Sequence, residues 1–306
     1  MESKNRNIQG KEGMLTDCNL CSWHCNVDRT ETLGVCKCGK APKLALASVH
    51  YWEEPCISGT KGSGTVFFSG CNFKCDFCQN YSISQEGFGK EISIHRLAEI
   101  FLELQEQGVH NINLVSPTPY VFAIIEALDI AKKNGLQLPV VYNTNSYETP
   151  ETIRKLNGYI DIYLPDLKYV SLETALMLSK VPNYFEAAST AIAEMVNQVG
   201  RPQFDKNGMM TKGVIIRHLV LPNHLTETKK VIEWVKENLN DRVYLSIMAQ
   251  YFPTYKAKEH KDINRKLNKK EYTLILRMLE NIENGYIQEL GEFEEEYVPN
   301  FDLRGV

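Results

Sequence analysis

Short apolar runs alternate with amphipathic stretches between residues 64 and about 250, and this alternation predicts repeated strand–helix units. The apolar runs are nearly continuous, which is typical of parallel strands whose faces are both covered by helices. The pattern predicts six strands: TVFF (65–68), INLV (112–115), LPVVYNTN (138–145), IDIYLPDLK (160–168), GVIIRHLVLPN (213–223) and VYLSIMAQY (243–251).

The amphipathic stretches carry ordinary helix start and stop signals. Ser93 can cap a helix that ends at Gly108, and a second helix ends at Gly135. Thr149 before Pro150 is a good N-cap and first-turn pair for a third helix. Helical sequence also precedes residue 199 and fills residues 226–239. The chain is therefore α/β, either an open sheet or a barrel. In both, ligands bind beyond the carboxyl ends of the strands.

Three regions follow from this pattern. Residues 1–62 are rich in cysteine and end in the joint SGTKGSG, residues 63–250 form the strand–helix core, and residues 251–306 complete the chain. The last region is predicted to hold one helix near residues 269–284 and an acidic tail, GEFEEEYVPN.

Composition narrows the classes of function. With 34 basic and 38 acidic residues the net charge is −4, and no basic patch is evident, so nucleic acid is not an expected partner. No run approaches the length of a membrane span, and the polar N-terminus lacks the apolar core of a signal peptide. We therefore expect a cytoplasmic protein that does not bind membranes.

All nine cysteines fall within the first 78 residues. A disulfide framework is typical of small secreted domains, whereas clustered cysteines in a cytosolic chain of this size indicate a metal. One cluster, Cys71, Cys75 and Cys78, lies just beyond the first predicted strand. Three thiolates can hold three irons of a [4Fe-4S] cube and leave the fourth open, although such clusters normally take four cysteines. A zinc site completed from elsewhere in the chain is the alternative.

The loop SGCNFKCDFCQN resembles the radical S-adenosylmethionine (radical SAM) superfamily, in which SAM binds the open iron. Together with TNS and PDLK, the loop is similar to the activating enzymes of glycyl radical enzymes, such as pyruvate formate-lyase activating enzyme. The PflX-type group is more similar still. That resemblance covers nearly the whole chain, including CNLCSWHCNVDRT, EEPCISG, HNINLVSPTPY and IIRHLVLPN. It implies a partial (β/α)6 barrel, a [4Fe-4S] cluster, and reductive cleavage of SAM to a 5′-deoxyadenosyl radical that abstracts hydrogen.

The resemblance also implies cofactor contacts at the strand ends. Phe77 would lie against adenine, and Ser116 and Thr118 stand where relatives have a Gly-Gly-Glu turn that binds the SAM amino group. Lys168 would pair with the SAM carboxylate, while Thr144 and Asp166 would share a small cation or hydrogen bonds. The predicted set is completed by Asn143 and Arg217. Taken singly, Asp166 and Lys168 could equally be a surface pair and Arg217 a solvated strand residue. Their shared position at strand ends favours the site.

Three neighbours of this set carry weaker signals. His218, Gln250 and Tyr251 also stand at strand ends, which favours the pocket. A histidine satisfied within the core is an equal alternative for His218.

Four further cysteines, Cys18, Cys21, Cys25 and Cys36, form a closed ligand set in one short segment, with His24 and Cys38 as alternates. Either a second [4Fe-4S] cluster or structural zinc would satisfy this spacing. Cys56 stands apart beside Glu53 and Glu54. A lone cysteine is usually a small buried hydrophobe, but Cys56 could instead donate hydrogen to a substrate radical.

The resulting expectation is a radical SAM enzyme reduced by a flavodoxin or ferredoxin type electron donor. Its substrate is either a glycyl radical enzyme or a small molecule that undergoes epimerisation or dehydrogenation. A non-catalytic zinc module is the third alternative.

Overall fold

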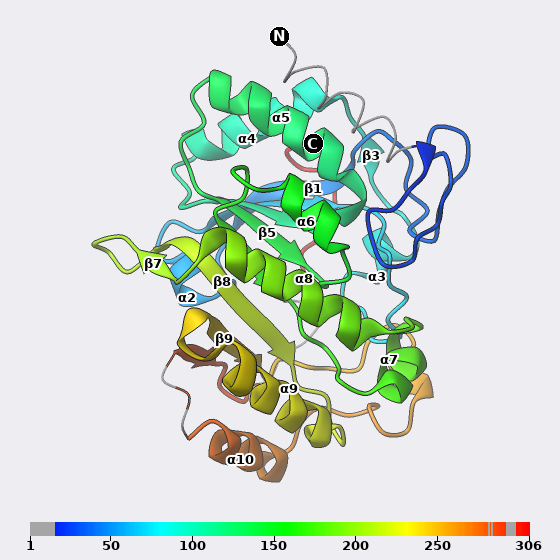
Figure 1. The fold of residues 1–306 in the computed structure, drawn as a ribbon, viewed down its shortest axis with the longest axis vertical. Helices are drawn as coiled ribbons and strands as arrows, with labels where there is room; N and C mark the ends of the chain where they lie inside the picture. Colours follow the sequence, from blue (N-terminus) through cyan, green and yellow to red (C-terminus); the bar gives the residue numbers. More distant parts are fainter. Residues whose placement is uncertain (1–15, 281, 283, 292–297) are drawn as a thin grey trace.

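The computed structural model describes residues 16–280, 282, 284–291 and 298–306. Its centre is one sheet, which in the described residues has the strand order β10-β9-β8-β6-β5-β4-β2-β1-β3, with β7 paired to β8 (Figure 1). The strands are β1 (Lys43–His50), β2 (Ser63–Phe68), β3 (Lys90–Glu91), β4 (Ile112–Val115), β5 (Val140–Thr144), β6 (Ile162–Pro165), β7 (Gln203–Phe204), β8 (Met210–Leu219), β9 (Tyr244–Met248) and β10 (Gly285–Ile287).

Strands β2, β4, β5, β6, β8 and β9 are the six predicted from the apolar runs, and neighbouring members pair in parallel. The predicted α/β class with a central parallel sheet is therefore confirmed. The sheet is open, because β10 and β3 stand at its two ends among the described strands.

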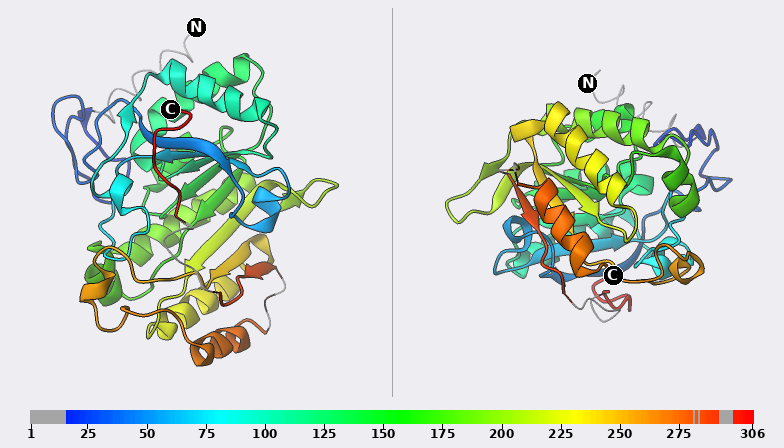
Figure 2. Two further views of the ribbon diagram at one scale, coloured as in Figure 1. Left: turned by 180° about the vertical axis from the view of Figure 1, so that it is seen from behind. Right: turned by 90° about the horizontal axis from the view of Figure 1, so that it is seen from below.

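Helices cover the sheet face turned toward the viewer in Figure 1, while the last residues of the chain cross the other face and the segment of residues 16–40 lies at one edge (Figure 2). The helices are α2 (Pro55–Ser58), α3 (Tyr81–Ser84), α4 (Ile94–Glu106), η1 (Thr118–Tyr120), α5 (Val121–Lys133), α6 (Pro150–Lys155), α7 (Leu172–Ser179), α8 (Tyr184–Val199), α9 (Leu225–Asn238), η2 (Asn240–Arg242), η3 (Ala257–Glu259) and α10 (Lys269–Met278).

The helix starts follow the local chemistry expected from the sequence. Ser93 Oγ accepts from the backbone N–H of Arg96 at 3.1 Å, and Thr149 Oγ1 accepts from that of Thr152 at 3.3 Å. The inner faces of these helices and the strand faces that they cover form the main apolar core, while alternate strand residues on the other face form two smaller apolar clusters. Strand β2 is buried along its whole length, so the loop that follows it begins from a rigid base.

The predicted boundary near residue 62 falls between two strands of one sheet. Strand β1 runs antiparallel to β2, from Leu44 opposite Phe68 to His50 opposite Ser63. The last residues return to the other side of β1, where Ala47 N donates to Arg304 O at 2.9 Å. The first and third regions thus share the sheet of the core, and their separate roles remain predictions.

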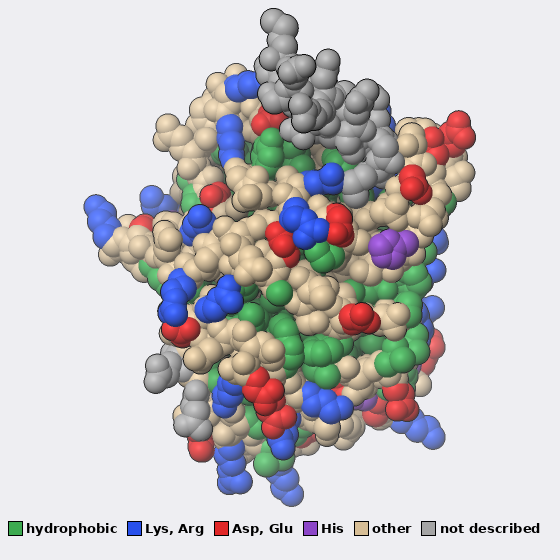
Figure 3. All heavy atoms as spheres, in the orientation of Figure 1, with side chains coloured by type: hydrophobic (Ala, Val, Ile, Leu, Met, Phe, Trp, Pro, Cys, Tyr) green, Lys and Arg blue, Asp and Glu red, His purple; other side chains and the backbone are tan. Residues whose placement is uncertain are grey.

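The helix predicted near residues 269–284 is wrong at its C-terminal end. Helix α10 ends at Met278, and β10 then pairs in parallel with β9. Most of the predicted acidic tail, residues 292–297, lies outside the described residues. Among the described helices, none combines the length and apolar character needed to cross a membrane. On the face seen in Figure 3, acidic and basic side chains are interspersed.

Candidate functional site: a cysteine loop at the strand ends

The three cysteines Cys71, Cys75 and Cys78 follow β2 in a loop that is docked against α7. Backbone N–H groups of Lys74 and Asp76 donate to the carbonyls of Ser179 (3.3 Å) and Leu178 (2.9 Å). These bonds hold the loop at the carboxyl ends of the parallel strands, where ligands of such sheets bind.

The Asp76 carboxylate adds two side-chain anchors. It contacts Lys180 Nζ and His260 Nε2, each at 2.7 Å. The loop is therefore tied both to the helical layer and to the third region of the chain.

All three thiols are free, and burial raises the pKa of each. Burial raises the pKa of Cys75 to about 12, although the Lys168 ammonium acts to lower it. Cys75 Sγ lies 3.0 Å from Ser179 Oγ, and Cys78 Sγ lies 3.2 Å from Ser84 Oγ. Thiolates at these positions require a nearby cation, which a bound metal would supply.

Cys75 and Cys78 line a cavity of about 480 Å³ at the strand ends. Seven of the predicted site residues share its wall: Cys75, Phe77, Cys78, Asn143, Asp166, Lys168 and Arg217. The pairing registers explain this convergence, because Val115 lies opposite Asn143, Thr144 opposite Pro165, and Asp166 forms a bridge with Arg217. Side chains scattered along the sequence thus meet at one edge.

A chain of charges crosses the cavity wall. Lys168 Nζ lies 2.6 Å from Asp166 Oδ2, and Arg217 Nε donates to Asp166 Oδ1 at 3.0 Å. Arg217 also donates from Nη1 to Glu53 Oε2 (3.1 Å) and from Nη2 to Asn143 Oδ1 (2.6 Å). Burial opposes ionisation of Asp166, but Lys168 and Arg217 outweigh it and hold the pKa of that carboxyl below its usual value.

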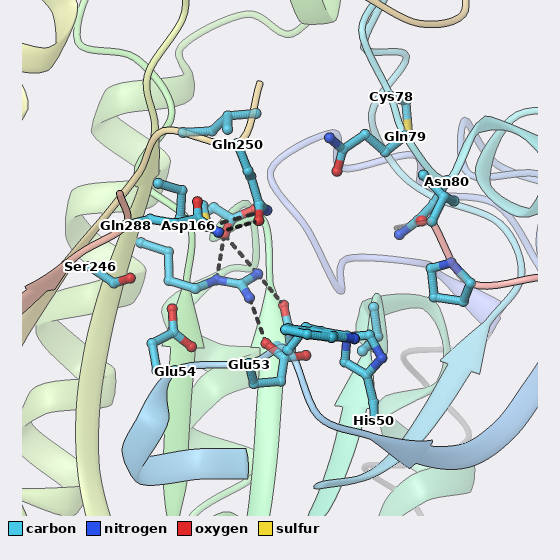
Figure 4. Close-up of a pocket in the computed structure, with 18 of the residues that line it drawn as sticks. His50, Glu53, Glu54, Cys78, Gln79, Asn80, Asp166, Ser246, Gln250 and Gln288 are labelled. Carbon is cyan, nitrogen blue, oxygen red and sulfur yellow. Dashed lines mark hydrogen bonds and ion pairs between the residues drawn. The ribbon is translucent and has the colours of Figure 1, made fainter. Parts of the chain in front are cut away.

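Sequence reasoning missed the acidic residues Glu53 and Glu54 as part of the site. Both line the cavity, and burial raises the pKa of each. Glu54 Oε2 has no hydrogen-bond partner among the described residues, although Ser246 lies close enough to favour the ionised carboxylate. In Figure 4 these carboxyl groups face the cavity from the side opposite Cys78, Gln79 and Asn80. Their signal in the sequence was only their position beside Cys56.

Thr118 and Thr144 do not line this cavity. Both donate to Oε1 of the buried Glu148, at 2.6 Å and 2.5 Å, and Tyr142 does so at 3.2 Å. Thr144 meets Asp166 only through the backbone, where Asp166 N donates to Thr144 O at 2.8 Å. The Thr144 hydroxyl thus bonds the buried Glu148 rather than Asp166, and the small cation that Thr144 and Asp166 were expected to share stays a prediction.

Ser116 has a left-handed backbone, with φ of 57°, and its N–H donates to Asn143 O at 3.0 Å. It lies at the end of β4 but outside the residues that line the cavity. Its predicted contact with the SAM amino group stays a prediction.

The structure places the three residues with weaker sequence signals in different surroundings. Gln250 lines the cavity and accepts from Gln288 Nε2 at 3.0 Å. Tyr251 is buried, donates to Ile263 O at 2.6 Å and packs its ring edge against Phe77. His218 is a satisfied core histidine, with Leu167 O 2.7 Å from Nδ1 and Thr228 Oγ1 2.9 Å from Nε2.

Cys56 is buried in α2, within an apolar cluster that includes Ile162 and Ile215. Its thiol does not line the cavity, although Tyr286 does and lies beside Cys56. Burial raises the pKa of this thiol to about 11, so it carries its proton near neutral pH. Its proposed hydrogen donation stays a prediction.

The four cysteines of the second set line one small cavity of about 20 Å³. Its wall is completed by Asn72, from the first cysteine loop, and by Thr118 and Pro119, which follow β4. Cys38 is outside it, since its Sγ donates to the carbonyls of Cys36 (3.1 Å) and Ser69 (3.7 Å). His24 is exposed and pairs with Asn19 at 3.2 Å, so the alternates are not part of the cavity.

The donor chemistry of Cys71, Cys75 and Cys78 fits an iron–sulfur cluster. Each of the three thiols lies within electrostatic range of another, and Lys168 faces all of them. In the part of the chain that the structure describes, no three His, Cys, Asp or Glu side chains converge closely enough to hold one metal ion. A cube cluster does not need such convergence, because each thiolate binds its own iron.

Comparison with known proteins agrees with this chemistry. The profile of the radical SAM superfamily matches residues 65–235. A relative from Methanocaldococcus jannaschii, "Uncharacterized protein MJ0674", is 36% identical over 285 residues, which cover 89% of this chain and 77% of that protein.

Solved structures show weaker likeness. SuiB of Streptococcus suis bound to S-adenosylmethionine has a TM-score of 0.49 at 16% identity, covering 72% of this chain and 48% of SuiB. A domain of a pyruvate-formate lyase-activating enzyme from Bacteroides vulgatus has a TM-score of 0.42 at 13% identity, covering 58% of this chain and 99% of that domain. The chain spans about half the length of the SuiB structures that it matches.

Proposed function

Because this chain belongs to the radical SAM superfamily, we propose that it cleaves S-adenosylmethionine reductively at a [4Fe-4S] cluster held by Cys71, Cys75 and Cys78. One observation carries the proposal: two of these free thiols open onto the same cavity as the Lys168–Asp166–Arg217 chain of charges. Three thiolates leave one iron for the cofactor. Assignment to the PflX-type group, near the glycyl-radical-enzyme activating enzymes, rests on the sequence motifs.

When bound, the cluster and SAM supply one-electron cleavage of the sulfonium bond, which yields methionine and a 5′-deoxyadenosyl radical that takes a hydrogen atom from substrate. The chain's own residues hold the reactants. The Lys168 ammonium lies next to Cys75 and suits the SAM carboxylate, and Phe77 offers an apolar ring to the adenine. Asp166 and Arg217 fix the Lys168 head group, since Asp166 bonds both cations. A flavodoxin or ferredoxin type protein is the proposed electron donor.

The character of the cavity supports a small polar substrate. Its far wall carries Glu53 and Glu54, two buried carboxyl groups, and Glu54 has an oxygen free to accept a hydrogen bond. A carboxylate buried without a partner is costly, so an ammonium or hydroxyl group of the substrate would stabilise it. Epimerisation or dehydrogenation of such a molecule is the reaction class that we propose.

Activation of a glycyl radical enzyme is the second candidate and rests on the resemblance in sequence. A glycyl residue carries no ammonium or hydroxyl group, so its backbone N–H is the donor that it could offer to Glu54. A protein-based radical, seen by electron paramagnetic resonance after mixing with a candidate partner, would favour it. Deuterium from solvent in a small product would favour the small-molecule reaction.

We also propose that Cys18, Cys21, Cys25 and Cys36 bind a metal, either a second [4Fe-4S] cluster or structural zinc. The support is that all four line one cavity.

The test of function is the release of 5′-deoxyadenosine. Anaerobically reconstituted protein given dithionite and SAM should form it, and Cys75→Ala should not. The matched control is Cys38→Ala, which removes a buried thiol outside both cavities. Full activity of Cys75→Ala would overturn the proposal.

A further inference from the structure

The second cysteine set surrounds a buried positive charge. Arg29 lines the small cavity together with the four thiols, and its side chain is 2% exposed. Its guanidinium donates only to backbone carbonyls, those of Cys38 (3.2 Å), Gly39 (2.6 Å) and Pro119 (2.5 Å). Among the described residues Arg29 makes no ion pair with a carboxylate. A buried charge requires a partner, and thiolates of a metal site would provide the negative charge.

Zinc and a cluster differ in the function that each could have at this position. A zinc ion held by four thiolates has no redox chemistry. A [4Fe-4S] cluster held by the same four thiolates can take up one electron and pass it on. Of the two, only a redox-active group would gain a role from a place directly beside the first cysteine loop.

One residue, Asn72, joins this set to the first cysteine loop. Asn72 is 3% exposed, lines the four-cysteine cavity and lies beside Cys21. Its Nδ2 has no hydrogen-bond partner of ordinary geometry, so a polar donor is left unpartnered in the cavity. On the other side, Asn72 Oδ1 lies 3.9 Å from Cys71 Sγ. A single side chain therefore separates a ligand of one site from a ligand of the other.

Further contacts fix this junction. Trp23 Nε1 donates to Asn72 O at 2.7 Å, and Asn145 Nδ2 donates to Asn72 Oδ1 at 2.6 Å. Gly70, next to Cys71, has a φ of 86°, and any side chain there would clash with Cys38 Sγ. The two cysteine segments are thus packed directly against each other.

The second set lies on the side of the cysteine loop away from the substrate cavity. Cys75 and Cys78 line the 480 Å³ cavity, whereas Cys71 and Asn72 do not. The two cavities share no lining residue. From this position, the second cysteine set is better placed to deliver electrons to the first cluster than to bind substrate.

We propose that Cys18, Cys21, Cys25 and Cys36 hold a [4Fe-4S] cluster that relays electrons through the Cys21–Asn72–Cys71 contact to the SAM-binding cluster. The role as a relay rests on the proposed function, whereas the presence of the cluster does not. One electron passes from a reduced flavodoxin or ferredoxin type protein to the outer cluster. It then passes to the inner cluster, where cleavage of the SAM sulfonium bond consumes it, and the outer cluster returns to its oxidised state.

Metal analysis separates the two sites. Anaerobically reconstituted wild type should contain about eight irons per chain, and a Cys71→Ala/Cys75→Ala/Cys78→Ala variant about four. The reduced triple variant should show the paramagnetic signal of one isolated cluster, and the reduced wild type should show magnetic coupling between two. Cys38→Ala should match the wild type. Zinc without iron in the triple variant, or no coupling in a wild type that holds both clusters, would overturn the proposal.

The relay itself is tested by changing the electron source in a Cys21→Ala/Cys36→Ala variant. Formation of 5′-deoxyadenosine driven by reduced flavodoxin should fall by about tenfold or more, an effect of at least 1.4 kcal/mol on the barrier. Formation driven by dithionite, a small reductant that can reach the inner cluster directly, should stay near the wild-type rate. Equal loss with both reductants, or no loss with flavodoxin, would contradict the relay. Wild type that holds two clusters but never cleaves SAM would instead refute the proposed function.

Discussion

Arg217, on strand β8, donates from Nη1 to Oε2 of Glu53 at 3.1 Å, across 164 positions of sequence. Both side chains are largely buried, and Arg217 simultaneously bonds Asp166 and Asn143. The contact joins the strand-end charges to the segment that precedes β2. One guanidinium therefore organises the cavity wall.

Arg217→Met should destabilise the fold and the cofactor site together. It leaves Glu53 and Asp166 as buried carboxylates with fewer partners, a change that typically costs about 3–5 kcal/mol. Urea unfolding of the reconstituted protein measures the loss. Arg201→Met is the control, because Arg201 is 69% exposed in its pair with Asp241 and exposed pairs contribute at most about 1 kcal/mol. Equal effects of the two variants would contradict the role given to Arg217.

Lys168→Met should weaken SAM binding without loss of the cluster. The ammonium is proposed to pair with the SAM carboxylate, and it is not a metal ligand. We expect the dissociation constant of SAM to rise about tenfold, or about 1.4 kcal/mol, at unchanged iron content. Equilibrium binding of SAM checks this, with the exposed Lys133→Met as control. Wild-type affinity for SAM in Lys168→Met would contradict the proposed contact with the SAM carboxylate and leave Lys168 only its ion pair with Asp166.

Glu271 should make the free energy of unfolding depend on pH in the acid range. Its hydrogen bonds from Arg265, 2.7 Å and 2.9 Å long, hold the pKa of this carboxyl at about 2, below its ordinary value of 4.5. A pKa lower in the folded state means that stabilisation is complete above pH 4.5 and is lost as pH falls toward 2. The wild type should exceed Glu271→Gln by about 1 kcal/mol in unfolding free energy at pH 7, with the difference vanishing near pH 2. A difference independent of pH would contradict this.

Cys56→Ala should still release 5′-deoxyadenosine, because the thiol lies outside the cavity and away from the three loop cysteines. The hypothesis of hydrogen donation predicts that product formation nevertheless fails in this variant. Quantifying 5′-deoxyadenosine and product in one reaction decides the matter. Unchanged product yield would reduce Cys56 to a packing residue of α2.

The sequence was sufficient for those residues whose position follows from strand order alone. Asp166 and Arg217 stand at the ends of neighbouring parallel strands, so their meeting required only the fold. The loop cysteines likewise depend on their place after β2. Chemistry and topology could be inferred together at these positions.

Contacts between segments that are distant in the sequence could not be predicted, for a physical reason. Glu53 reaches Arg217, and Arg29 reaches Pro119, only because the first region packs across the sheet, which no local pattern reports. Strand β1 lies among cysteine-rich loops and was missed. The hydrogen bond from Thr144 to the buried Glu148 could not be predicted either, because Glu148 carries no distinguishing sequence signal.

The most direct test of the central claim is the paramagnetic resonance spectrum of the inner cluster with and without SAM. A variant with Cys18, Cys21, Cys25 and Cys36 changed to alanine retains the loop cysteines as its one proposed set of cluster ligands, and the wild type serves as a parallel sample. After reduction with dithionite, addition of SAM should change the spectrum, since SAM would bind the iron that lacks a cysteine. A cluster signal in both samples that SAM leaves unchanged would contradict the account.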